Sequence, residues 1–154
     1  TNHVNQLILA KQLVEHGANG NAVSIPQNMT PLHGACSWYI VTNLDFVELL
    51  LEAGADPNAQ DHLGLTPLMH TIPDAPGTAK FLLKWPATVA NITNRCGASF
   101  LAIVRSNITD FADKGAFPDN LEKVQHQFLL QQWREIEEIL VERSAADIGI
   151  NHNP

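Results

Sequence analysis

The sequence predicts an all-α solenoid of about four stacked helix-turn-helix units, with hairpin loops between them and a long C-terminal capping helix. Two recurring motifs predict this fold. Thr-Pro-Leu occurs at Thr30 and returns at Thr66, 36 positions later. Leu-Leu-Glu-Ala-Gly-Ala at residues 50–55 has counterparts at 13–18 and 140–145, and the two motifs alternate along the chain. A repeat of roughly this length is typical of solenoid proteins.

The first motif has the composition of a helix start. The hydroxyl of Thr30 or Thr66 can accept hydrogen bonds from unpaired backbone amides at a helix N-terminus. Pro31 and Pro67 then occupy the first helical turn, where an N–H is not needed. Each copy of the motif therefore predicts the first helix of a unit.

The second helix of the unit carries one apolar face. Phe46, Val47, Leu50 and Leu51 recur at helical spacing, and Gly54 suits a left-handed residue at the helix end. A single helix pair of this size leaves apolar surface uncovered, so neighbouring units must stack.

The end of the chain predicts a capping helix. It begins at Asp119 or Asn120 and ends near Ser144. Its apolar residues recur at helical spacing and are expected to cover the last repeat: Leu121, Val124, Phe128, Trp133, Ile136 and Leu140. Its charged face is expected to meet water through Glu135, Glu137, Glu138 and Glu142.

We expect residues 1–154 to form a single domain. It comprises a partial repeat at 1–24, repeats at about 25–60, 61–93 and 94–147, and an insertion in the last repeat at about 107–127. The second unit has extra residues around 39–42, and the third has Pro73 and Pro76 near the turn between its helices. The absence of an initiating Met, with an apolar pattern already present at 7–14, suggests a piece of a larger polypeptide.

These motifs resemble the ankyrin repeat, which has a unit of about 33 residues that opens with Thr-Pro-Leu-His and closes with Gly-Ala-Asp-x-Asn. Residues 132–140 are also similar to the last repeat of fungal ankyrin proteins that continue into a MYND-type zinc finger, and no such finger lies within this sequence. The resemblance implies that His33 ties adjacent units through hydrogen bonds. It also places Asn58 in a loop where asparagine can be hydroxylated in the family, although a hydrogen-bonding role in the turn is favoured.

Composition and motifs argue against several functions. The net charge of −7 lacks the basic surface that binds nucleic acid or anionic membranes. No apolar run or signal peptide is present, so an intracellular location, cytoplasmic or nuclear, is expected. Cys36 and Cys96 are too few for a disulfide framework, and the scattered histidines lack metal-ligand spacing. We therefore expect no enzyme activity, no metal and no cofactor.

The leading functional hypothesis is a protein-binding module, because the resemblance implies a concave binding face formed by hairpin tips and first helices. The alternative is an architectural or regulatory domain that packs against other parts of its own longer chain. Two leucines at a hairpin tip favour contact with a partner, whereas Trp38 and Tyr39 suit an interface and packing about equally. The candidate partner-binding residues are Gln27, Met29, Ser37, Trp38, Tyr39, His62, Leu63, Leu65, Asp74, Arg95 and Arg105. Pro73 and Cys96 occupy neighbouring surface positions, while Trp85 and Trp133 are expected in the core or cap.

Overall fold

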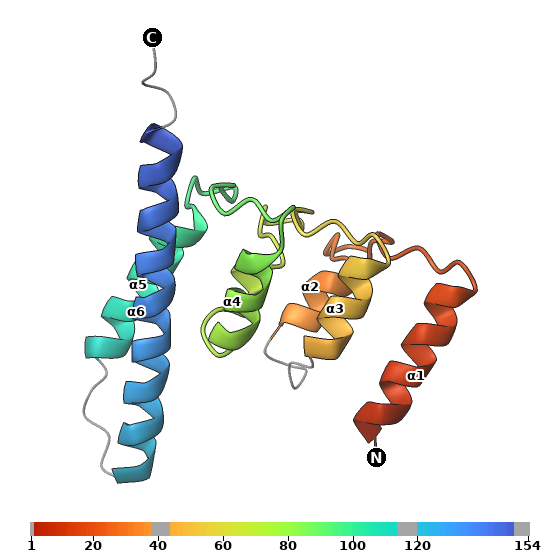
Figure 1. Cartoon of the computed structure of the whole chain (residues 1–154), viewed down its shortest axis with the longest axis horizontal. Coiled ribbons are helices and arrows are strands. Elements are labelled where there is room, and N and C mark those ends of the chain that lie inside the picture. The colour runs from red at the N-terminus through yellow and green to blue at the C-terminus, as the bar shows by residue number, and fades with distance from the viewer. Residues whose placement is uncertain (1, 38–43, 114–119, 150–154) are drawn as a thin grey trace.

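The computed structural model describes residues 2–37, 44–113 and 120–149 and places its helices in a row (Figure 1). The row starts with α1 at one end and finishes with α5 and α6 at the other. No strand occurs within these ranges, so the predicted all-α solenoid is confirmed. The elements are α1 (Asn2–Glu15), α2 (Pro31–Cys36), α3 (Leu44–Glu52), η1 (Met69–Thr71), α4 (Pro76–Lys84), α5 (Phe100–Asp113) and α6 (Asn120–Gly149).

The predicted helix start at Thr30 is confirmed. Thr30 is the N-cap of α2, Pro31 follows in the first turn, and His33 completes a reciprocal capping box. In the third unit the corresponding first helix is only the 3-10 turn η1. Pro73 accounts for the difference, since it has no N–H to donate to the carbonyl four residues earlier.

The predicted glycine C-cap is also present. Gly54 has a φ of +85°, which favours glycine because other residues meet a steric penalty there. The N–H of Gly54 donates to the Leu51 carbonyl at 3.0 Å, and that of Ala55 donates to the Leu50 carbonyl at 2.9 Å. Gly17 ends α1 with the same pattern of bonds, so the local sequence determines both helix ends.

One continuous core joins the units from α2 to α6. Val47, Leu50 and Leu51 of α3 are buried, as the apolar pattern predicts. Cys36 is buried in this core as well, and desolvation raises the pKa of its thiol to about 12. The side chain is therefore a protonated packing group and not a nucleophile.

Helix α6 covers the last repeat with only part of its predicted apolar stripe. Trp133, Ile136 and Leu140 are buried, whereas Val124 and Phe128 are 61% and 63% exposed. The expectation that these two residues cover the repeat was therefore wrong, and the N-terminal part of α6 extends beyond α4 (Figure 1). The helix also continues to Gly149, beyond the predicted end near Ser144.

Polar contacts anchor α6 to earlier elements. Glu135 accepts a hydrogen bond from Lys80 of α4 at 2.5 Å, and Glu137 accepts one from Arg105 of α5 at 2.7 Å. The indole N–H of Trp133 donates to the Pro73 carbonyl at 2.8 Å. The two glutamates therefore do not simply face water, as predicted, but take part in fixing the cap.

Candidate functional site

Three short hairpins separate the helix pairs, and in each a backbone hydrogen bond joins the first residue to the last. We define them as the first hairpin (24–29), the second hairpin (61–65) and the third hairpin (94–98). The closing bonds run from Ser24 N to Met29 O, from Asp61 N to Leu65 O and from Asn94 N to Ala98 O, at 2.9, 3.0 and 3.0 Å. The residue before each closing acceptor has a positive φ, and these residues are Asn28, Gly64 and Gly97.

The hairpins are bonded to one another at their tips. The Gln27 carbonyl in the first hairpin accepts the N–H of His62 in the second, at 2.9 Å. The Leu63 carbonyl then accepts the N–H of Arg95 in the third, at 3.0 Å. Gly64 permits this approach, since a Cβ there would lie 2.8 Å from the Arg95 nitrogen. The three tips consequently form one connected ridge.

A buried carboxylate holds the second hairpin in shape. One oxygen of Asp61 accepts the N–H groups of Leu63 and Leu65, at 2.8 and 2.9 Å, and the other lies 2.9 Å from His70 Nε2. Burial opposes ionisation of Asp61, but the hydrogen bonds from His70, Leu65 and Leu63 outweigh it and lower its pKa. The ionised carboxylate thus fixes the loop that carries Leu63.

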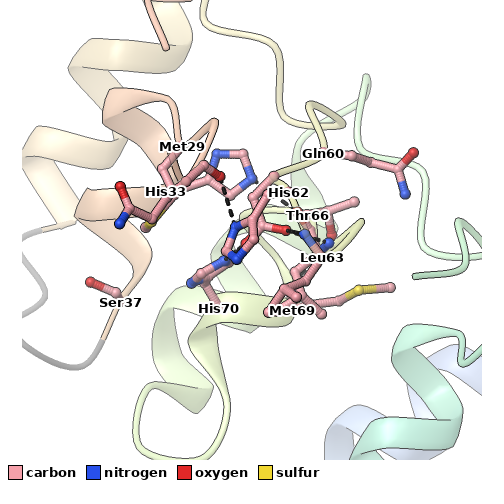
Figure 2. Close-up of polar contacts among 12 residues, drawn as sticks. Met29, His33, Ser37, Gln60, His62, Leu63, Thr66, Met69 and His70 are labelled. Carbon is pink, nitrogen blue, oxygen red and sulfur yellow. Dashed lines mark hydrogen bonds and ion pairs between the residues drawn. The ribbon is translucent and has the colours of Figure 1, made fainter. Parts of the chain in front are cut away.

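His33 links the second and third units, as the family resemblance implies. Its Nδ1 accepts the N–H of Thr30 at 3.1 Å, so Nε2 carries the proton and donates it to the Leu65 carbonyl at 3.0 Å. Desolvation by burial lowers the pKa of His33, which favours this neutral form. The rings of His33 and His70 meet edge to face, with centroids 5.2 Å apart (Figure 2).

Asn58 has a structural role, but its side-chain amide bonds the next unit and not the nearby backbone of its own turn, as the sequence favoured. Its amide nitrogen donates to the Ala87 carbonyl at 2.7 Å, and its amide oxygen accepts the N–H of Val89 at 2.8 Å. Asn21 makes the equivalent pair of bonds one unit earlier, to Gly54 and Asp56. Both ends of each amide are therefore engaged in joining units.

The structure distributes the predicted binding residues unevenly. Leu63 is exposed beside the first helices (Figure 2), whereas Leu65 is half-buried against the core, which accounts for its apolar character. Arg105 is exposed but donates to Glu137. The other described candidates fall into two groups. Four are exposed, namely Gln27, His62, Asp74 and Arg95, and two are half-buried, namely Met29 and Ser37. Trp38 and Tyr39 lie outside the described residues.

Two surface residues of the first hairpin region were not anticipated. Ile25 is 93% exposed and Val23 is 53% exposed. A hollow of about 480 Å³ lies beside them, with a mostly apolar lining that includes Val23, Met29 and Pro31. The sequence signal was the Ile25-Pro26 pair, since an apolar residue in a turn that faces water serves no packing role.

Two kinds of feature are absent from the part of the chain that the structure describes. Within 2–37, 44–113 and 120–149, no group of three His, Cys, Asp or Glu side chains is placed to hold a metal ion. In the same part of the chain no helix is long and apolar enough to cross a membrane.

Comparison with known proteins agrees with this architecture. A family model of ankyrin repeats, in three copies, matches residues 2–61. The chain is 46% identical over 57 residues to the ankyrin repeat and LEM domain-containing protein 1 homolog of Caenorhabditis elegans, which is 37% of this chain. It is 38% identical over 63 residues to the 2-5A-dependent ribonuclease of Mus musculus, or 41% of this chain. Each match spans only 8% of the relative.

The motifs, the stacked helix pairs and these matches together define a helical repeat protein. More specifically, residues 2–61 match the family model of ankyrin repeats, and this part of the chain is similar to ankyrin-repeat proteins. Ankyrin repeats are generally protein-protein interaction modules and are typically not enzymes, and solenoid folds of this kind present extended binding surfaces.

Proposed function

We propose that this domain binds a partner protein through the face formed by its three hairpin tips and first helices. The observation that carries the proposal is the connected ridge of tips, which exposes Leu63 although the hairpin fold does not need it there. The rigid bonding between tips supports this role, because a preformed surface loses little conformational entropy on binding.

The chemistry of this face also suits protein recognition. It combines apolar residues with polar ones such as Gln27, His62 and Asp74, the mixture typical of an interface with an apolar centre and a polar rim. No catalytic role is proposed for it. We retain Met29, Ser37, Arg95 and Arg105 as rim candidates.

Site-specific photocrosslinking in native cells tests the location of binding. A photoreactive amino acid is placed at Leu63 or Asp74 on the proposed face, and at the exposed control positions Glu48 on α3 and Val141 on α6. We expect crosslinks to the same partner protein from Leu63 and Asp74 and none to it from the controls. If only Glu48 or Val141 gives crosslinks to that partner, the partner binds another face of the domain and the proposed location is wrong.

A second function, the architectural one, is favoured by a separate observation. Ile8, Leu9 and Leu13 of α1 are about half exposed, so an apolar side of this helix is uncovered. Another part of a longer chain packed on α1 would explain it, since large exposed apolar patches usually mark contacts. A photoreactive residue at Leu9 would then yield crosslinks within one polypeptide, whereas crosslinks from Leu63 would be absent.

A further inference from the structure

Two apolar side chains in the N-terminal part of α6 are largely uncovered. Val124 is 61% exposed and Phe128 is 63% exposed. They lie four residues apart, so they occupy the same side of the helix. The core side of α6 is a different one, where Trp133 and Ile136 are buried. The helix therefore has a second apolar side, which the repeats leave open.

This second apolar side faces in the same direction as the residues of α6 that bind α4. Gln132 and Glu135 both accept hydrogen bonds from Lys80 of α4, at 2.6 and 2.5 Å. Phe128 precedes Gln132 by four residues and Glu135 by seven, and these spacings place all three on one side of a helix. A further unit stacked on the end of the solenoid would contact the opposite side of α6. The exposure of Val124 and Phe128 therefore does not depend on such a unit.

Helix α4 begins too late to cover these side chains. Lys80 lies four residues after Pro76, where α4 begins, whereas Gln132 lies 12 residues after Asn120, where α6 begins. Both helices run in the same direction (Figure 1), and the difference of eight residues corresponds to about 12 Å of helix. The start of α6 projects beyond α4 by this length, so a helix of another molecule can lie beside it without meeting α4.

The surroundings of the two side chains are uncharged. No Asp, Glu, Lys or Arg occurs from residue 124 to residue 133. The exposed neighbours in this stretch are Gln125, Gln127 and Gln131. A strongly acidic or basic partner would find no opposite charge here. Two copies of a chain with a net charge of −7 repel each other, and an uncharged apolar strip is where they approach at the least electrostatic cost.

The apolar strip is also complementary to itself. When two α6 helices lie antiparallel about a two-fold axis at residue 126, position 124 of each copy faces position 128 of the other. Val124 of one copy then packs against the larger Phe128 of the second copy, and the reverse contact follows by symmetry. One two-fold contact thus covers all four exposed side chains.

We propose that this chain forms a dimer through the N-terminal part of α6, with Val124 of each copy packed against Phe128 of the other. The hairpins lie at the opposite end of the helices from this part of α6 (Figure 1). The dimer therefore leaves the hairpin tips free and presents two copies of them. Two linked faces strengthen binding to any partner that carries two matching sites. This inference goes beyond the proposed function and does not rest on it.

Sedimentation velocity of the 154-residue chain tests the dimer. Four apolar side chains make a contact smaller than a standard protein-protein interface, so we expect a weak dimer with a Kd of about 100 μM. The sedimentation coefficient should rise from the monomer value towards the dimer value as the concentration passes through this range. A chain that remains monomeric at about five times this concentration would overturn the inference.

Two charge substitutions and one control locate the contact. Phe128→Glu and Val124→Lys should each weaken self-association about tenfold or more, because each places a charge against an apolar side chain. Val141→Glu should leave self-association unchanged, since Val141 is an exposed apolar residue elsewhere on α6. Circular dichroism checks that all three variants remain helical. If folded Phe128→Glu and Val124→Lys chains associate as the wild type does, the contact lies elsewhere and the inference is wrong.

A mixture of the two charge variants tests the antiparallel pairing. In a mixed dimer the carboxylate introduced at position 128 faces the ammonium introduced at position 124, while the unchanged Val124 and Phe128 still pack together. We expect the equimolar mixture to associate about threefold or more tightly than either variant alone. Association no tighter in the mixture than in the separate variants would show that the proposed pairing is wrong.

A photoreactive residue at Phe128 distinguishes a second copy from a different protein. In native cells it should give crosslinks between two copies of the chain. If it crosslinks only another protein and the purified chain stays monomeric, the strip binds that protein and the inference is wrong. The proposed function is judged separately, by the crosslinks from Leu63 and Asp74.

Discussion

Replacement of His33 by alanine is expected to destabilise the whole domain, because this buried side chain joins two units. The substitution removes two hydrogen bonds, from Thr30 N–H to Nδ1 at 3.1 Å and from Nε2–H to the Leu65 carbonyl at 3.0 Å. Each bond contributes about 1 kcal/mol net, and a partner left unpaired in the interior costs about 1–3 kcal/mol. His33 is 0% exposed, so the lost ring also leaves a cavity. We expect the free energy of unfolding to fall by about 2–4 kcal/mol.

Urea unfolding monitored by far-ultraviolet circular dichroism at pH 7.5 measures this loss. The control is His62→Ala. Like His33, His62 has a ring nitrogen beside a backbone carbonyl of another unit, that of Gln27, but its side chain is exposed, so its effect should stay within about 1 kcal/mol. The slope of the unfolding free energy against urea concentration must be the same in each variant as in the wild type for the comparison to hold. A loss below about 1 kcal/mol for His33→Ala would refute the assignment of His33 as the bond between units.

Three further predictions concern pH, the cap and the second hairpin. Because burial lowers the pKa of His33, the unfolded chain takes up the proton near pH 6.5 before the folded chain does, so stability should fall as pH decreases below about 6.5. Unfolding at pH 7.5 and 5.5 checks this, and an equal stability at both would contradict it. Trp133→Phe should cost about 2–3 kcal/mol through the lost bond to Pro73, and thermal melts should show a smaller shift for the half-buried Trp85→Phe. Leu65→Ser should lower stability by about 1–2 kcal/mol, whereas Leu63→Ser should change it by less than about 0.5 kcal/mol in the same assay. Similar losses of stability for Trp133→Phe and Trp85→Phe, or for Leu65→Ser and Leu63→Ser, would show that the burial of these residues is misassigned.

Local motifs were sufficient to predict the helix boundaries that depend on short-range bonds. Thr30 caps α2 and Gly54 ends α3 through contacts within a few residues, so their roles follow from residue type alone. The family resemblance then correctly implied that His33 ties adjacent units, and the structure shows that it does so through a bond to the Leu65 carbonyl. The spacing of the two repeated motifs also predicted that hairpin loops lie between the helix pairs.

Side-chain exposure was less predictable, because it depends on neighbours that are distant in sequence. Leu63 and Leu65 have the same residue type and lie two positions apart, yet one is exposed and the other packs on the core. Ile25 was missed although the Ile25-Pro26 pair signalled an apolar residue in a turn, and its 93% exposure is seen only once the first hairpin has been placed.

The cap illustrates the division between sequence and tertiary structure most clearly. The apolar period of residues 121–140 predicts a helix, since backbone hydrogen bonds within the segment depend on local composition. Whether Phe128 or Trp133 is buried depends instead on how far α4 and α5 extend alongside α6. The ion pairs of Glu135 and Glu137 likewise required Lys80 and Arg105, which lie 55 and 32 positions away. Only the assembled repeats decide which parts of a predicted helix are covered and which remain available to a partner.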